Sequence, residues 1–139
     1  MPQPLLMDRP QSQRIFIAIV VPALYGLITG LLLGVSAGAY TALSLLGVLG
    51  GLAAGYDHSD ANEGAVRGIC GGMLFGTFIL LGGTLIGKEA KASIPDPQWT
   101  LPVITTVLGA IFGAIGASVR GRYERREVTE VGARTRSSV

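Results

Sequence analysis

The sequence predicts an all-α integral membrane protein, in which four transmembrane helices pack as one bundle through glycine-rich faces. A mean hydropathy of +0.52 and a charged fraction of 14% are unlike those of a soluble domain of 139 residues. No charged residue lies within 15–55, 68–87 or 97–119. Uncharged apolar runs of about 20 residues can cross about 30 Å of hydrocarbon, because an α-helix rises about 1.5 Å per residue.

The lengths of these runs predict four spans. The run 15–55 must hold two of them, because its 41 residues would form about 60 Å of helix. The segment from Gly34 to Gly38 supplies small residues for the tight turn between them. We expect a leader at 1–14, a transmembrane domain over 15–119 and a basic tail at 120–139, with spans near 15–33, 38–55, 64–87 and 101–119.

The distribution of lysine and arginine predicts that both termini face the cytoplasm of a bacterial-type plasma membrane. In that orientation nine of the eleven basic residues lie inside, six of them at or beyond Arg120. The two outer residues are Lys88 and Lys91. This asymmetry satisfies the positive-inside rule.

Glycine recurs every fourth residue in each apolar run, a spacing that forms a nearly bare stripe on one helix face. Lipid provides no hydrophobic reason for helices to associate, so close backbone approach at small residues must hold them together. We therefore expect helix contacts at Gly26, Gly30, Gly34, Gly47, Gly51, Gly55, Gly64, Gly68, Gly72, Gly76, Gly109 and Gly113.

These glycine stripes have two interpretations. They can be used within one four-helix bundle, or they can face other subunits. A second small face in the third span, formed by Gly71, Gly82 and Gly83, favours a homo-oligomer or a subunit of a larger membrane complex. The similarity of 26–34 to 68–76 also suggests two tandem helical hairpins, although glycine-rich apolar sequences match one another easily.

The polar loop 56–63 contains the single histidine and invites a metal-site interpretation. Asp60 and Glu63, however, have the spacing of a capping box that opens the third span. The remaining Asp57 and His58 are too few for a closed site, so we expect no metal and no other cofactor. The single cysteine, Cys70, cannot form an internal disulfide.

Five arginines are candidates for contacts with lipid headgroups. Arg67 is the one charge near a span interior, and we expect it to reach the inner interface beside Glu63. Binding of an anion is the alternative for Arg67. The other four arginines follow the last span, where they can bind anionic headgroups or simply fix the topology: Arg120, Arg122, Arg125 and Arg126.

The sequence indicates no catalytic function. It has no nucleophile paired with a base, no paired intramembrane carboxylates and no phosphate-binding loop. Basic residues interleaved with aromatic ones, as in nucleic-acid binding, are also missing. We expect a non-enzymatic packing, assembly or accessory protein whose partners are membrane lipids and other membrane subunits. A small homo-oligomeric channel for an ion or small solute is the alternative.

Overall fold

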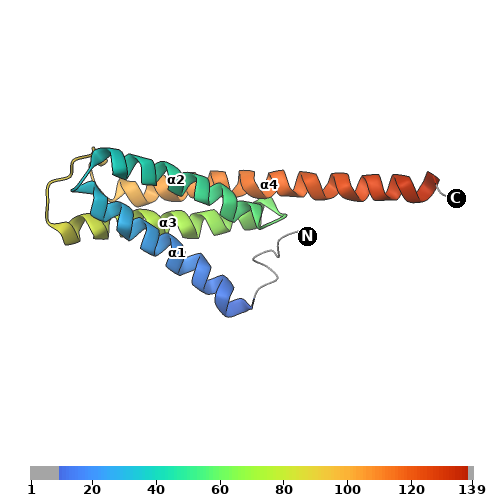
Figure 1. The fold of residues 1–139 in the computed structure, drawn as a ribbon, viewed down its shortest axis with the longest axis horizontal. Coiled ribbons are helices and arrows are strands. Elements are labelled where there is room, and N and C mark those ends of the chain that lie inside the picture. Colours follow the sequence, from blue (N-terminus) through green and yellow to red (C-terminus); the bar gives the residue numbers. More distant parts are fainter. Residues whose placement is uncertain (1–9, 138–139) are drawn as a thin grey trace.

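The computed structural model describes residues 10–137, and all of the regular secondary structure in that range is helical (Figure 1). Its four helices are α1 (Gln11–Leu33), α2 (Ala37–Tyr56), α3 (Ala61–Ile86) and α4 (Thr100–Ser137). All four are long and apolar enough to cross a membrane. The prediction of an all-α chain with four long apolar helices is therefore confirmed.

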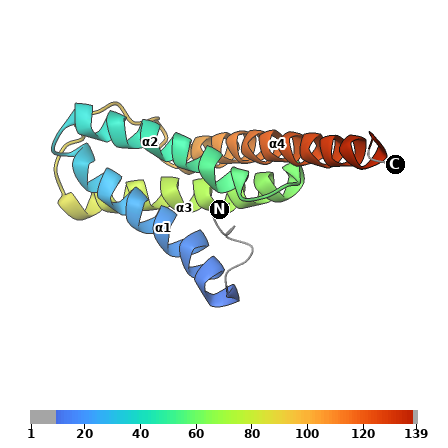
Figure 2. The ribbon, with the colours of Figure 1, turned by 45° about the vertical axis from the view of Figure 1, so that its right-hand side comes forward.

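Antiparallel α3 and α4 form the centre of the bundle, with α1 packed along α3 and α2 packed mainly along α4. The start of α1, the α2–α3 connection and the outer part of α4 lie at one end of the bundle (Figure 1). We call this the termini end. The first half of α1 diverges from the other helices toward that end, as both views show (Figures 1 and 2).

Short polar side chains cap two of the helices. Asp60 begins α3, where its Oδ1 accepts hydrogen bonds from the backbone amides of Asn62 (2.8 Å) and Glu63 (3.3 Å). The predicted cap at Asp60 is thus confirmed. Ser36 caps α2 in the same way by accepting a bond from the amide of Ala39 at 3.3 Å. Both caps satisfy amides that have no carbonyl partner within the first helical turn.

Helix α4 does not end near residue 119, as we expected, but continues through the basic segment to Ser137. The apolar run does end there, but hydropathy reports where a helix leaves lipid rather than where its backbone stops. No proline follows Pro102, and arginine and glutamate are good helix formers. An ion pair across one turn, between Arg120 and Glu124 at 2.7 Å, adds local support.

The two predicted hairpins pack differently from one another. In α3, Gly68, Gly72 and Gly76 face α4, whereas the glycines aligned with them in the first hairpin face α3. Helices α1 and α2 contact each other much less than α3 and α4 do. The aligned segments therefore contact unlike neighbours.

Candidate functional site

The closest helix approach in the described structure lies between α3 and α4. A Cβ atom added to Gly68 would overlap the carbonyl oxygen of Gly109, and a Cβ atom at Gly109 would overlap that of Gly68. Gly64 and Gly113 are related in the same reciprocal way. Backbone packs directly on backbone at both pairs, which only glycine permits.

The remaining predicted glycines of α3 continue this contact toward the far end of the bundle. A Cβ atom at Gly72 would overlap the carbonyl oxygen of Thr105, and one at Gly76 would overlap the hydroxyl of Thr105 and lie 2.7 Å from Cα of Pro102. All four glycines of the 64–76 stripe thus face α4.

The glycines of α1 contact α3. Gly26 and Gly30 lie against the backbone of Phe75 and Ile79, and Gly82 of α3 lies against α1 in return. A Cβ atom at Gly34 would lie 2.9 Å from Cγ2 of Ile86. Gly82, which the sequence placed on a second face for another subunit, is instead buried inside this contact.

Among its glycines, helix α2 approaches a neighbouring helix backbone closely only at the termini end. There Gly55 lies against the backbone of Gly113, and Gly116 lies against that of Leu52. At the glycines farther along α2, no backbone of a neighbouring helix comes close. A Cβ atom at Gly47 would meet the ring of Phe75 at 2.9 Å, and one at Gly51 would come no nearer than 3.9 Å to Phe112.

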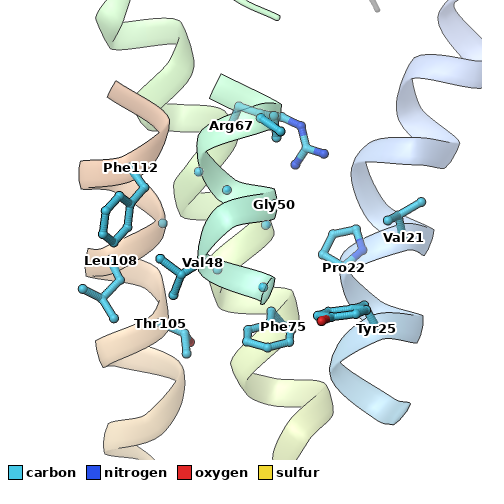
Figure 3. A pocket seen from close by; sticks show the side chains of 18 of the residues that line it. Val21, Pro22, Tyr25, Val48, Gly50, Arg67, Phe75, Thr105, Leu108 and Phe112 are labelled. Carbon is cyan, nitrogen blue, oxygen red and sulfur yellow. The ribbon is translucent and has the colours of Figure 1, made fainter. Parts of the chain in front are cut away.

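The space left beside α2 is a cavity of about 680 Å³, to which all four helices contribute (Figure 3). Its walls are mainly apolar and include several glycines, which leave room that side chains would otherwise fill. Within the cavity, Asp57 and Arg67 mark the termini end, and Tyr25 and Phe75 lie on the opposite side.

Tyr25 and Phe75 link three helices at the inner end of this cavity. Their rings stack with centroids 5.7 Å apart and an interplanar angle of 22°. The Tyr25 hydroxyl donates a hydrogen bond to the carbonyl oxygen of Leu43 at 2.8 Å, which joins α1 to α2. The two helices diverge from this point toward the termini end.

Arg67 does not adopt the predicted position beside Glu63. No ion pair joins the two residues within 10–137, and the side chain extends into the cavity (Figure 3). Its Nη1 lies 3.3 Å from the place of a Cβ atom on Gly71, one turn farther from the termini end. The Nε atom is buried and has no hydrogen-bond partner among the described residues. Gly71, without a side chain, makes this inward orientation sterically possible.

The arginines that follow the last span have different surroundings. Arg120 donates to Glu124, and its guanidinium lies 5.8 Å from the ring centroid of Tyr56 and 3.4 Å from the Tyr56 carbonyl oxygen. Arg125 donates from Nε to the Gly121 carbonyl at 3.2 Å. Arg122, Arg125 and Arg126 are exposed on α4.

The loop 56–63 brings no metal-binding cluster together. Within residues 10–137, no group of three His, Cys, Asp or Glu side chains is close enough to hold one metal ion. His58 is half-buried, and its Nδ1 has no hydrogen-bond partner in that part of the chain.

Three features of the site were not predicted from the sequence. Gly116 and Gly121 make backbone contacts although neither belongs to the predicted four-residue spacing. A Cβ atom on Gly121 would lie 2.7 Å from the carbonyl oxygen of Ser59. The stack of Tyr25 on Phe75 and the cavity beside it had no sequence signal either, because both depend on which helix faces which.

These observations define the class of the chain as a four-helix protein whose helices are each long and apolar enough to cross a membrane. Comparison with known proteins adds no family to that class, since no family model, curated protein or solved structure matches the sequence.

Proposed function

We propose that the protein is a non-catalytic accessory or assembly subunit of a membrane complex. Its four helices form a glycine-zipper-packed bundle in a bacterial-type plasma membrane, with both termini in the cytoplasm. The tandem arrangement of two helical hairpins belongs to the same proposal. The projecting part of α4, residues 120–137, is the observation that carries it.

Apart from Arg120 and Gly121, which contact the end of α2 and the α2–α3 connection, the projecting part of α4 lies beyond the rest of the bundle (Figure 1). Its 18 residues correspond to about 27 Å of helix. A single helix that is polar on all sides is marginally stable in water unless something else contacts it. A partner that packs against it would supply the missing contacts.

The charge of the projecting part favours an acidic partner. Residues 120–137 contain six arginines and three glutamates, a formal charge of +3. They lack an apolar stripe that would pair two copies of this helix as a coiled coil. The glycine stripe 64–76 of α3 is already in contact with α4, and Gly82 and Gly83 are in contact with α1, so they offer little surface to a second copy. An acidic region of a different membrane subunit therefore fits better than a homo-oligomer.

The uneven distribution of the basic residues favours a cytoplasmic position for this partner. In this orientation Arg120 and Arg122 lie at the level of lipid headgroups, whereas Arg125 and Arg126 lie about 9 Å to 11 Å beyond the end of the apolar run. The first two can contact anionic lipid, and the second two remain available to a protein.

A photo-reactive amino acid at the exposed Tyr123 tests the proposal in cells that express the full chain. We expect one discrete adduct with a second membrane protein, lost when Arg122, Arg125 and Arg126 are replaced by Glu. The matched control places the probe at the lipid-exposed Val107, where no such adduct should form. A product of two copies of this chain, or no product at Tyr123, would contradict the proposal.

A small channel is the second candidate, and the cavity is the observation that favours it. The cavity extends from Arg67 to Tyr25 and Phe75 inside the bundle. Flux of an anion or small solute through liposomes containing the purified protein would support a channel. We expect no flux above that of empty liposomes, because the Tyr25–Phe75 stack lies across the inner end of the cavity.

A further inference from the structure

We propose that the cavity beside α2 is a binding site for a single-chain anionic amphiphile, a fatty-acid carboxylate, whose head group pairs with Arg67. This site is independent of the partner surface on α4. Three observations carry it: an unpaired cation, an apolar space of suitable size, and the depth at which the cation lies.

Arg67 supplies the recognition of an anion. Its guanidinium is turned toward Gly71 and away from the termini end, and its buried Nε has no partner among the described residues. A buried donor without an acceptor costs free energy, more so when it is charged. A carboxylate offers two acceptor oxygens in the geometry that a guanidinium fits.

Asp57, the other charged residue of the cavity wall, does not fill this role. No ion pair within 4.0 Å joins it to Arg67, so the guanidinium remains open to a ligand. The carboxylate of Asp57 lies at the termini end, where it would repel an anion that stayed at the mouth. An anion is thereby favoured deeper in the cavity, beside Arg67.

The cavity supplies an apolar space for the chain of the ligand. Its volume of about 680 Å³ lies within the range of pockets that bind small molecules. From Arg67 to Phe75, the eight residues of α3 correspond to about 12 Å, along which the walls are glycine and apolar side chains. Gly50 has no atom within 4 Å of its added Cβ position, so this wall is not closed by a neighbouring helix.

The depth of Arg67 selects a small amphiphile over a bilayer phospholipid. Gly121 contacts Ser59, which places the headgroup arginines of α4 level with the start of α3. Arg67 lies seven residues beyond Asp60, or about 10 Å deeper. A phospholipid phosphate held at the level of Arg120 and Arg122 does not reach it. A fatty acid can sink to this depth because its head group is one carboxylate.

Binding of radiolabelled dodecanoate to the purified full chain in phosphatidylcholine nanodiscs tests the site, with empty nanodiscs as background. We expect saturable binding that Arg67→Gln weakens at least about tenfold, the loss expected for one hydrogen bond between charged groups. Dodecanol should compete poorly, because it offers no charge. Gly51→Leu should abolish binding by filling the cavity, whereas Ala42→Leu, which adds the same side chain to the same helix outside the cavity, should not.

Photolabelling of the unaltered protein provides a measurement that does not depend on the folding of a variant. A fatty acid with a diazirine at the end of its chain should label Tyr25 and Phe75 in preference to the lipid-exposed Leu45. Labels spread over lipid-exposed positions, or equal competition by dodecanol and dodecanoate, would overturn the proposal. Undiminished binding in Arg67→Gln would overturn it as well.

Discussion

The carbonyl oxygens of Gly68 and Gly109 each occupy the position that a side chain on the other glycine would require. This reciprocal contact fixes how closely α3 and α4 approach, and the pair Gly64 and Gly113 repeats it one turn away. At such distances Cα–H groups face carbonyl oxygens across the two helices, a weak attraction that lipid cannot replace.

Gly68→Ala should destabilise the protein by about 1–3 kcal/mol, because the added methyl group overlaps backbone that cannot rotate away. Gly50→Ala is the matched control, since open space surrounds that glycine. It should be neutral or stabilise by up to about 1 kcal/mol, because alanine is the better helix former. Unfolding in mixed micelles measures both changes. Equal effects would show that α3 and α4 are not held at this contact.

Leucine at Gly72 should cost more than the loss of a hydroxyl at Thr77. The leucine side chain would force α4 away from the carbonyl of Thr105. Thr77 is exposed on the bundle surface, and hydrogen bonds between membrane helices average about 0.6 kcal/mol. A larger loss of stability in Thr77→Val than in Gly72→Leu would contradict this account of the bundle.

Tyr25→Phe should destabilise the protein slightly, by about 0.6 kcal/mol, because it removes the bond to Leu43 and keeps the ring. Tyr25→Ala should cost clearly more, since the stack on Phe75 is lost too. The same micelle unfolding experiment compares the two variants. If both behave alike, the hydrogen bond to α2, and not the stack on α3, holds α1 in place.

Arg120→Gln should change stability by no more than about 1 kcal/mol. Its pair with Glu124 is partly exposed, and such pairs contribute little because water and salt screen them. The contact with the Tyr56 ring adds a comparably small amount. The effect should shrink further when the salt concentration is raised during the measurement. A change as large as that of Gly68→Ala would show that the contact of Arg120 at the termini end dominates.

Cysteine labelling in intact cells tests the orientation, with Cys70 first replaced by Ala. A cysteine at position 90, in the α3–α4 connection, should react with an impermeant thiol reagent. One at position 59, between α2 and α3, should react only after the membrane is opened. The reverse pattern would show that the termini end faces outward.

His58→Ala should leave both thermal stability and metal content unchanged. The chain has one histidine, and residues 10–137 contain no cluster of metal-binding side chains. We therefore expect no transition metal to bind to the loop 56–63. Elemental analysis of the purified protein measures this directly. Stoichiometric zinc that disappears in His58→Ala would establish a metal site that includes a further ligand.

The sequence by itself determined the parts of this protein that depend on short-range physics. Hydropathy and length give four spans, because crossing hydrocarbon requires about 20 apolar residues in any fold. The cap at Asp60 follows from the local geometry of a helix start. The spacing of Gly64, Gly68, Gly72 and Gly76 also places them on one helix face before any neighbour is known.

Only the tertiary structure decided which helix each face meets. A bare glycine stripe fits any neighbouring backbone, so the sequence could not tell that α3 turns its stripe to α4 while α1 turns its own to α3. The extension of α4 to Ser137 could not be predicted from hydropathy, because hydropathy falls where a helix enters water even when the helix continues. The cavity at Arg67 arises where α1 and α2 diverge from the stack of Tyr25 on Phe75. The angle between two helices depends on what each packs against, and that leaves no pattern along the chain.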